Sequence, residues 1–132
     1  MNGKSALSIQ DMANQCGVSA HTLRYYERIG LLGPIRRSAN GHRQYSADDV
    51  GWVQLLVCLR ETGMNIQDML RFADVDGPNL SVAERRLALL EAHREAVRAR
   101  QRTVEEHLQR IEGKLAYYRT ELIAAGLIED EE

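Results

Sequence analysis

The chain has 132 residues, of which 44% are hydrophobic and 27% are charged, so its composition favours one globular domain with an extension. No apolar run reaches the length of a membrane span, and two widely separated cysteines do not make a disulfide framework. We therefore expect a cytoplasmic protein with reduced thiols, no signal peptide and no membrane association.

Charge is distributed unevenly along the chain. The formal net charge is −2, but residues 1–45 contain six Lys or Arg against two Asp or Glu, a local charge of +4. Residues 46–132 carry the compensating −6. Affinity for phosphates depends on the local field and not on the total charge, so the basic N-terminal third is a candidate for binding a polyanion.

The first predicted helix follows Ser8. Ser8 and Asp11 have the spacing of a capping box, with Asp in place of the usual Glu or Gln, and Gly17 stands where a left-handed cap would end the helix. The apolar stripe of this helix would consist of Ile9, Met12, Ala13 and Cys16. For Cys16 this stripe predicts a packing role in the core.

A second helix is predicted from Ser19, which has the N-cap residue type. Leu23, Tyr26 and Ile29 recur at near-helical spacing and can face a core. Other faces would carry His21, Arg24, Tyr25 and Arg28. Two short helices around a glycine turn, the second with outward cations, form the helix-turn-helix pattern, whose second helix enters the major groove of DNA.

A β-hairpin is predicted around Asn40-Gly41, because this dipeptide favours a two-residue turn with positive φ at both positions. The flanking segments carry Ile35, Arg36 and Arg37 on one side and His42, Arg43 and Tyr45 on the other. Such a wing would straddle the DNA backbone beside the second helix. The alternative is an ordinary surface hairpin with solvated arginines, which we rank lower because the positive charge is concentrated here.

Two further helices are predicted after the wing. Ser46 and Asp49 would begin the first, which runs to Gly63 and is apolar on nearly every side, so it should lie between two layers. Asn65 and Asp68 would begin a short second helix. We call this pair the hub, and we expect it to connect the DNA-binding part to the rest of the chain.

A long helix should follow, with Ser81 and Glu84 as a capping box and Gly126 as its cap, spanning roughly 65 Å. Eleven positions between 87 and 122 alternate spacings of three and four, and nine of them are apolar or aromatic, the exceptions being Arg94 and Gln101, so they form a heptad seam. The predicted dimerisation residues are Leu87, Leu90, Val97, Val104, Leu108, Ile111, Leu115, Tyr118 and Leu122. The rest of the chain is too small to cover this seam, which favours an identical partner chain over a helix folded back on its own domain.

The second helix and the wing together resemble a known family. T-L-R-Y-Y-E-R-I-G-L-L (residues 22–32) followed by R-x-x-N-G-H-R-Q-Y (residues 37–45) is similar to the signature of the MerR family of bacterial transcription regulators. The resemblance implies phosphate contacts from the second helix and the wing, at Arg24, Tyr25, Tyr26, Arg37, His42, Arg43 and Tyr45. His21 and Thr22 join this predicted DNA-binding set. Many relatives carry Tyr where this chain has His42.

The resemblance also implies a fold and a mechanism. The fold would be mainly α: a winged helix-turn-helix with its two-helix hub (1–75), a linker (76–80), a dimerisation helix in an antiparallel coiled coil (81–126) and an acidic tail (127–132). The homodimer would bind a two-fold symmetric promoter operator. It would distort that DNA in response to an effector, so that RNA polymerase can use the promoter.

Cys58 is the candidate sensor, and no cofactor or metal is expected. The run C-L-R-E-T-G-M (58–64) with R-F-A-D (71–74) resembles the carbonyl- and thiol-stress branch of the family, where one cysteine at this place is the proposed target of aldehydes and other electrophiles. There is no cysteine after Cys58 for thiolate metal sensing, and His93 and His107 are not spaced as a metal pair.

Alternatives remain open. Cys58 could be a packed residue, with a non-covalent ligand as the effector. The chain could be a coiled-coil adaptor with a vestigial helix-turn-helix, which would show no salt-dependent DNA binding. An enzyme is the weakest hypothesis, because the sequence has no Gly-rich phosphate loop, no metal-ligand spacing and no nucleophile triad.

Overall fold

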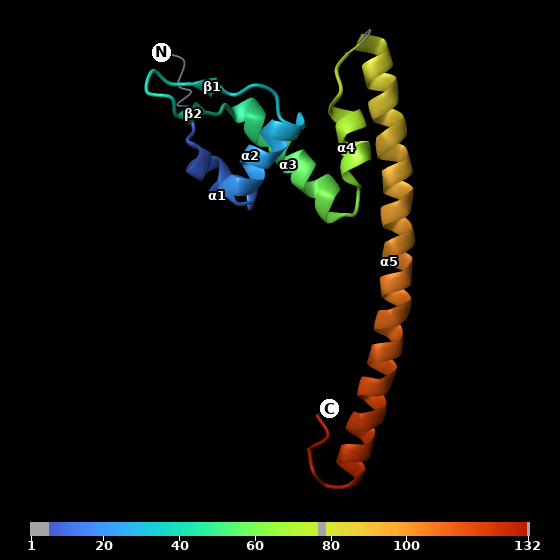
Figure 1. The fold of residues 1–132 in the computed structure, drawn as a ribbon. Helices are drawn as coiled ribbons and strands as arrows, with labels where there is room; N and C mark the ends of the chain where they lie inside the picture. Colours follow the sequence, from blue (N-terminus) through green and yellow to red (C-terminus); the bar gives the residue numbers. More distant parts are fainter. Residues whose placement is uncertain (1–5, 77–78, 132) are drawn as a thin grey trace. The chain divides into compact units, whose positions relative to one another are not determined.

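The structure, a computed structural model, describes residues 6–76 and 79–131 (Figure 1). It contains five helices and one two-stranded sheet within these residues, in the order α1, α2, β1, β2, α3, α4, α5. The chain divides into two compact units, the first ending at Glu91 and the second beginning at Ala92. The mainly α fold predicted from the sequence, with a helix-turn-helix and a long C-terminal helix, is confirmed.

The two helices of the helix-turn-helix begin and end where their caps predict. α1 (Ile9–Cys16) has a complete capping box between Ser8 and Asp11, and Gly17 ends it in the left-handed region at φ 71°. α2 (Ala20–Ile29) is capped by Ser19, whose hydroxyl oxygen accepts from the backbone N–H of Thr22. Each cap satisfies backbone N–H groups that have no partner inside the helix.

The wing is an antiparallel pair of short strands, β1 (Arg36–Arg37) and β2 (Arg43–Gln44). The predicted two-residue turn is wrong. Among the described residues only glycines have positive φ, so of the pair Asn40 and Gly41 only Gly41 lies in the left-handed region. The N–H of Ser38 donates to the carbonyl oxygen of His42, and the N–H of Gly41 donates to the carbonyl oxygen of Ser38. This is a three-residue loop, in which a turn is followed by a left-handed glycine.

The hub consists of α3 (Ala47–Glu61) and α4 (Ile66–Ala73), and both predicted N-caps are confirmed. Ser46 and Asp49 form a capping box at α3, and the Asn65 side chain accepts from the N–H of Asp68 at α4. α3 packs against α1 and against α4, as its apolar character on several sides predicts.

One hydrophobic core holds the first unit together. Its buried side chains come from α1, α2, the segment after α2, the end of the wing, α3 and α4. They are Met12, Ala13, Cys16, Leu23, Tyr26, Leu31, Leu32, Tyr45, Val53, Leu56, Leu59, Met64, Met69 and Phe72. The core therefore packs α2, the wing and the hub together in one unit. We call α2 the recognition helix, because it is the second helix of the helix-turn-helix.

The long helix α5 (Asn79–Ala124) begins two residues earlier than predicted. Ser81 lies inside the helix, so the predicted capping box of Ser81 and Glu84 does not mark its start, and helical backbone already occupies the end of the predicted linker. Gly77 and Pro78 of that linker lie outside the described residues.

The C-terminal end of α5 agrees with the predicted cap. Gly126 has φ 72° and donates its N–H to the carbonyl oxygen of Ile123, while Leu127 donates to Leu122. The chain turns back here beside the last turns of α5 (Figure 1). An open apolar groove of about 410 Å³ results, lined by Ile111, Lys114, Leu115, Tyr118, Arg119, Leu122 and Ile128.

Residues 6–76 and 79–131 contain neither a membrane-spanning helix nor a cluster of metal-ligating side chains. None of the helices there combines the length and the apolar character that crossing a bilayer requires. No group of three or more His, Cys, Asp and Glu side chains lies close enough together to hold a metal ion.

Candidate nucleic-acid interface

The outer face of α2 carries exposed cations. Arg24 and Arg28 lie one turn apart and are exposed, and His21 is exposed at the helix start. The guanidinium of Arg28 lies 5.4 Å from the centre of the Tyr25 ring, within the range of a cation–π interaction. Thr22 is half-buried, and its hydroxyl lies 3.1 Å from that of Ser19 in the cap.

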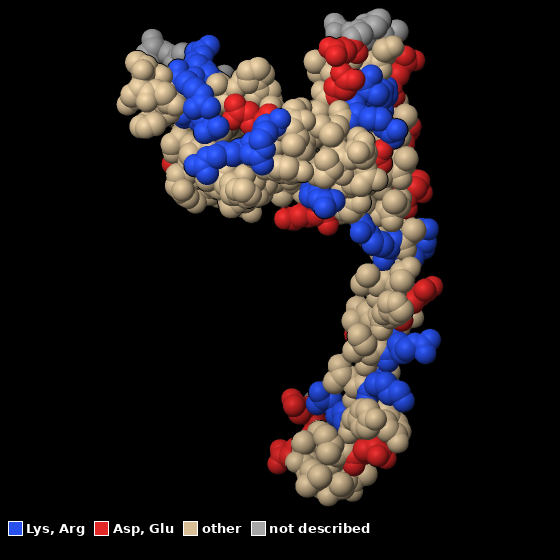
Figure 2. Space-filling view, in the orientation of Figure 1, with Lys and Arg blue, Asp and Glu red and all other residues tan. Residues whose placement is uncertain are grey.

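The wing adds a second set of cations. Arg36 and Arg37 of β1 and His42 of the loop are exposed. Arg37 donates from Nη1 to the carbonyl oxygen of Gly41 over 3.0 Å, which ties this guanidinium to its own loop. Figure 2 shows Lys and Arg side chains gathered over the wing and α2, with an acidic patch among them.

Arg43 connects the wing to α2. Its Nε lies 2.8 Å from Oε1 of Glu27, and both side chains are largely covered, at 23% and 21% exposure. The hydrogen bond with Glu27 raises the pKa of Arg43, so the guanidinium stays charged. Arg43 is one of the phosphate contacts expected from the family resemblance, whereas nothing in the spacing of residues along the chain predicts its carboxylate partner Glu27.

Tyr45 lies in the core, which disagrees with the expected phosphate contact of its hydroxyl. The residue is 1% exposed, and its hydroxyl is buried without a hydrogen-bond partner among the described residues. Burial raises the pKa of Tyr45. Its backbone pairs with Leu7 through two hydrogen bonds, so Tyr45 attaches the end of the wing to the segment before α1.

Tyr26 is a second tyrosine whose side chain lies inside the protein and not on the surface where the expected DNA contact would form. It is buried in the core on the same stripe of α2 as Leu23, and burial raises the pKa of Tyr26. The helical spacing already predicted this inward direction, whereas the family resemblance predicted a DNA contact. Tyr25, one residue earlier, is half-buried at the edge of the exposed face.

The second helix and the wing lie together in one site, as predicted. Not every residue of the predicted DNA-binding set faces outward, however. His21, Arg24, Arg37 and His42 are exposed, and Tyr26 and Tyr45 are internal. Three residues outside the predicted DNA-binding set also belong to this surface: Arg28 of α2, Arg36 of β1 and Glu27, which pairs with Arg43.

Cys58 and Cys16 lie in different environments. Cys58 is exposed on α3, on the same side as Gly51 and Gln54, which agrees with the prediction that this is the least apolar side of the helix. Cys16 is 8% exposed, its thiol faces the carbonyl oxygen of Val50, and burial raises the pKa of this thiol. The core role predicted for Cys16 is confirmed.

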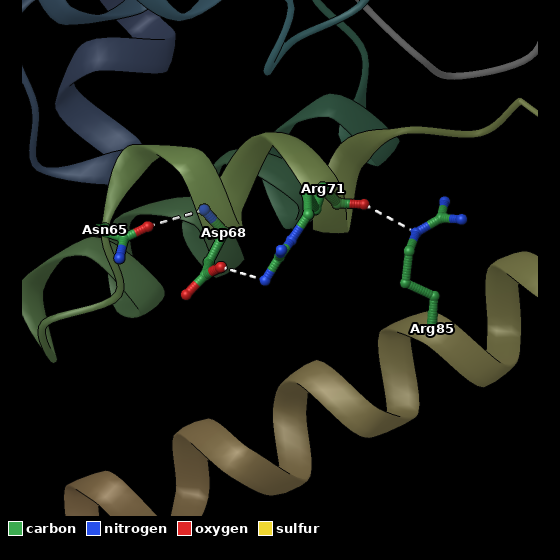
Figure 3. A network of polar contacts seen from close by, with 4 residues as sticks. All are labelled: Asn65, Asp68, Arg71 and Arg85. Carbon is green, nitrogen blue, oxygen red and sulfur yellow. Dashed lines mark hydrogen bonds and ion pairs between the residues drawn. The ribbon is translucent and has the colours of Figure 1, made fainter.

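The end of α4 is held by arginines from the first turns of α5. Arg85 donates from Nε to the carbonyl oxygen of Arg71 over 2.9 Å, while Arg71 pairs with Asp68, whose N–H is bound by Asn65 (Figure 3). Arg86 donates from Nε to the carbonyl oxygen of Phe72 over 2.8 Å. These cations satisfy carbonyls at the C-terminal end of a helix, where positive charge is favourable.

Known proteins of similar sequence are helix-turn-helix regulators, in agreement with the helix-turn-helix and wing described above. A family model described as MerR HTH family regulatory protein matches residues 7–73, which is half of the chain. An uncharacterized HTH-type transcriptional regulator of Haemophilus influenzae is 37% identical over 106 residues, 80% of this chain and 78% of the relative. The uncharacterized regulator YyaN of Bacillus subtilis is 35% identical over 123 residues, 84% of this chain and 89% of the relative.

A solved structure of similar fold is HiNmlR, a MerR family regulator lacking the sensor domain, bound to promoter DNA. The TM-score is 0.80 with 34% identity, covering 92% of this chain and 96% of that one. All three are described as regulators, and two of them as HTH-type transcriptional regulators.

Proposed function

The chain belongs to the MerR family of helix-turn-helix regulatory proteins, and on that premise we propose that it binds a two-fold symmetric promoter operator as a homodimer. It is a DNA-binding transcriptional regulator.

The basic face formed by α2 and the wing carries the DNA proposal. Arg24, Arg28, Arg36 and Arg37 are exposed there, and the core fixes both elements in one unit. We assign the backbone contacts to exposed or partly exposed groups of the predicted set. These are His21, Thr22, Arg24, Tyr25, Arg37, His42 and Arg43. Cationic and aromatic groups of this kind position a protein on phosphates, whereas base edges specify sequence.

Exposed apolar side chains along α5 support the homodimer. Leu87, Leu108, Ile111 and Leu115 are among the large apolar residues that remain exposed in the single chain. They occupy the predicted heptad seam, and an apolar stripe of this extent is typical of an interaction surface. We propose that the seam pairs with the same seam of a second chain, in the antiparallel coiled coil that the family resemblance implies.

Regulation would act through the shape of the operator. Two DNA-binding units joined by a coiled coil can hold the backbone while they bend and untwist the DNA between them, and RNA polymerase would read the changed geometry. Binding energy from phosphate contacts would offset the cost of the deformation.

We propose Cys58 as the sensor of an aldehyde or another electrophile. Its exposure makes the thiol accessible in the single chain, and the branch resemblance points to a cysteine at this place. An adduct would add bulk on α3, which packs against both α1 and α4. A non-covalent small-molecule effector remains the alternative.

DNA binding is tested by a fluorescence anisotropy titration with the promoter duplex that flanks the gene for this chain, at several salt concentrations. A random-sequence duplex is the comparison. The proposal expects tighter binding to the promoter duplex, with a linear fall of log affinity against log salt. Binding to neither duplex at any salt concentration would favour the adaptor hypothesis.

A further inference from the structure

Glu27 is an acidic side chain in the middle of a basic surface. Only two Asp or Glu residues occur among residues 1–45, and the other, Asp11, forms the capping box of α1. Glu27 has no capping role, since it lies in the third turn of α2. Its negative charge lowers the local attraction for phosphates, so its presence on this face needs a separate explanation.

The ion pair with Arg43 supplies that explanation. Glu27 accepts from Nε of Arg43 at 2.8 Å, across 16 positions of the chain, and thereby joins α2 to β2 of the wing. Within residues 6–76 and 79–131, strand β2 has two residues and pairs with β1 alone. The Glu27–Arg43 pair is therefore a direct polar link between the recognition helix and the wing.

The ion pair uses only Nε of Arg43, so the two terminal nitrogens can still bind a phosphate. A guanidinium has five N–H groups, one on Nε and four on the two terminal nitrogens. Glu27 uses Nε, and the terminal nitrogens of Arg43 have no hydrogen-bond partner within residues 6–76 and 79–131. In Arg37, by contrast, one terminal nitrogen already donates a hydrogen bond to the carbonyl oxygen of Gly41.

We propose that Glu27 is a positioning residue for DNA binding, which holds Arg43 so that its terminal nitrogens meet a phosphate and the wing keeps its place against α2. This inference rests on the proposed phosphate contact of Arg43. An arginine fixed before binding loses less side-chain freedom when it binds, and a bidentate contact to phosphate needs a defined orientation of the fork.

The opposite hypothesis is that Glu27 competes with DNA for Arg43. A carboxylate and a phosphate both accept from guanidinium groups, so Glu27 would then weaken binding. The two hypotheses predict changes of opposite sign when Glu27 is removed. Simple electrostatics also predicts tighter binding after the loss of an acidic charge near DNA.

The experiment compares Glu27→Ala, Glu27→Gln, Arg43→Ala and the double variant Glu27→Ala/Arg43→Ala in the full chain. Each is titrated against the promoter duplex as a function of salt. Glu61→Gln, an exposed acid on α3, is the matched control for charge loss. Thermal unfolding of each variant verifies that the protein is folded at the temperature of the titration.

Positioning predicts that Glu27→Ala weakens binding by about 5- to 10-fold, the size of coupling between contacting residues. The salt slope should fall by about one unit, as if a phosphate contact were lost. Glu27→Gln keeps a carbonyl acceptor for Nε and should stay within about 2-fold of the unmodified chain. Glu27→Ala should have no further effect once Arg43 is Ala.

Tighter binding by both Glu27 variants would overturn the proposal in favour of competition. Weaker binding that persists in the Arg43→Ala background would also overturn it, because Glu27 would then act by another route. If Arg43→Ala itself changes neither affinity nor salt slope, the proposed phosphate contact fails, and that failure is separate from an error about Glu27.

Discussion

Trp52 of α3 donates its indole N–H to the carbonyl oxygen of Leu31, two residues after the end of α2, over 2.9 Å. The same ring stacks on Phe72 of α4, with centres 5.7 Å apart, and the guanidinium of Arg86 lies 5.2 Å from both rings. One side chain therefore connects the end of the recognition helix with the hub and the first turns of α5.

Loss of Arg86 should loosen this connection. Arg86→Ala removes the cation from both rings and the hydrogen bond to Phe72, so we expect the free energy of unfolding to fall by about 1–2 kcal/mol. Trp52 is the single tryptophan of the chain, so its fluorescence reports the change directly. Arg94→Ala, which removes an exposed arginine, is the control and should leave the emission unaltered.

Arg24 is expected to contact a phosphate through its exposed guanidinium. Arg24→Ala should weaken binding to the promoter and to random-sequence duplex alike, and it should reduce the slope of log affinity against log salt by about one unit. Titrations at several salt concentrations measure both quantities. Arg102→Ala removes the same charge from α5 and should leave the slope unchanged. An effect confined to the promoter duplex would instead indicate a base contact.

The buried hydroxyl of Tyr45 is expected to cost stability. A buried hydroxyl without a partner is unfavourable by about 1–3 kcal/mol, so Tyr45→Phe should raise the free energy of unfolding by about 1 kcal/mol. Urea unfolding gives the change, with Tyr118→Phe, an exposed tyrosine, as the control. A lower midpoint in Tyr45→Phe would show that the hydroxyl has a favourable partner in solution.

Alkaline pH should destabilise the first unit. Burial raises the pKa of both Tyr26 and Tyr45, so the folded chain keeps phenol protons that the unfolded chain releases near the ordinary value of 10. These two phenols therefore leave stability unchanged below pH 10 and lower it as pH rises above 10. The thermal midpoint measured across this pH range should fall less steeply in Tyr45→Phe. Equal steepness in both chains would contradict the assignment.

The seam of α5 is expected to hold the dimer. Replacing Leu108 and Ile111 with Glu should give monomers that bind the operator weakly, because each apolar contact would become a buried unpaired charge. Sedimentation at micromolar concentration measures the mass. Gln109→Glu with Ala116→Glu adds two charges to exposed positions beside the seam and should stay dimeric. A 15 kDa species in the unmodified chain would refute the dimer.

The two cysteines should differ in reactivity. Iodoacetamide should alkylate exposed Cys58 first, and Cys16 only slowly, because Cys16 is buried and its raised pKa leaves less thiolate. Mass spectrometry of the native protein measures both. In cells, Cys58→Ala should abolish induction by formaldehyde while operator affinity stays within a few fold, and Cys16→Ala should keep induction. Normal induction in Cys58→Ala would favour a non-covalent effector.

Local signals account for the part of the fold that the sequence predicts. The N-caps at Ser8, Ser19, Ser46 and Asn65 each bind the backbone N–H of the residue three positions later. Such short-range signals can be found without a structure. The wing was also predicted, but its turn was not, because Asn-Gly fits both a two-residue loop and a longer loop with a single left-handed residue.

Contacts between distant residues account for the rest. The pair of Glu27 and Arg43 depends on how the wing packs against α2, and the burial of Tyr45 depends on the segment around Leu7. Neither follows from spacing along one element. The start of α5 was misplaced for another reason: Ser81 and Glu84 match a capping box inside a helix as well as they do at its start.

The uncovered seam of α5 also has a consequence for the amount of protein in a cell. A stripe of exposed leucine, isoleucine and tyrosine is a target for chaperones and proteases for as long as a chain remains single. If the proposed homodimer covers this seam, a new chain would meet a second copy sooner at higher concentration and escape degradation more often, so abundance would rise more steeply than synthesis. A regulator with this property sets a threshold on its own expression before any operator is bound.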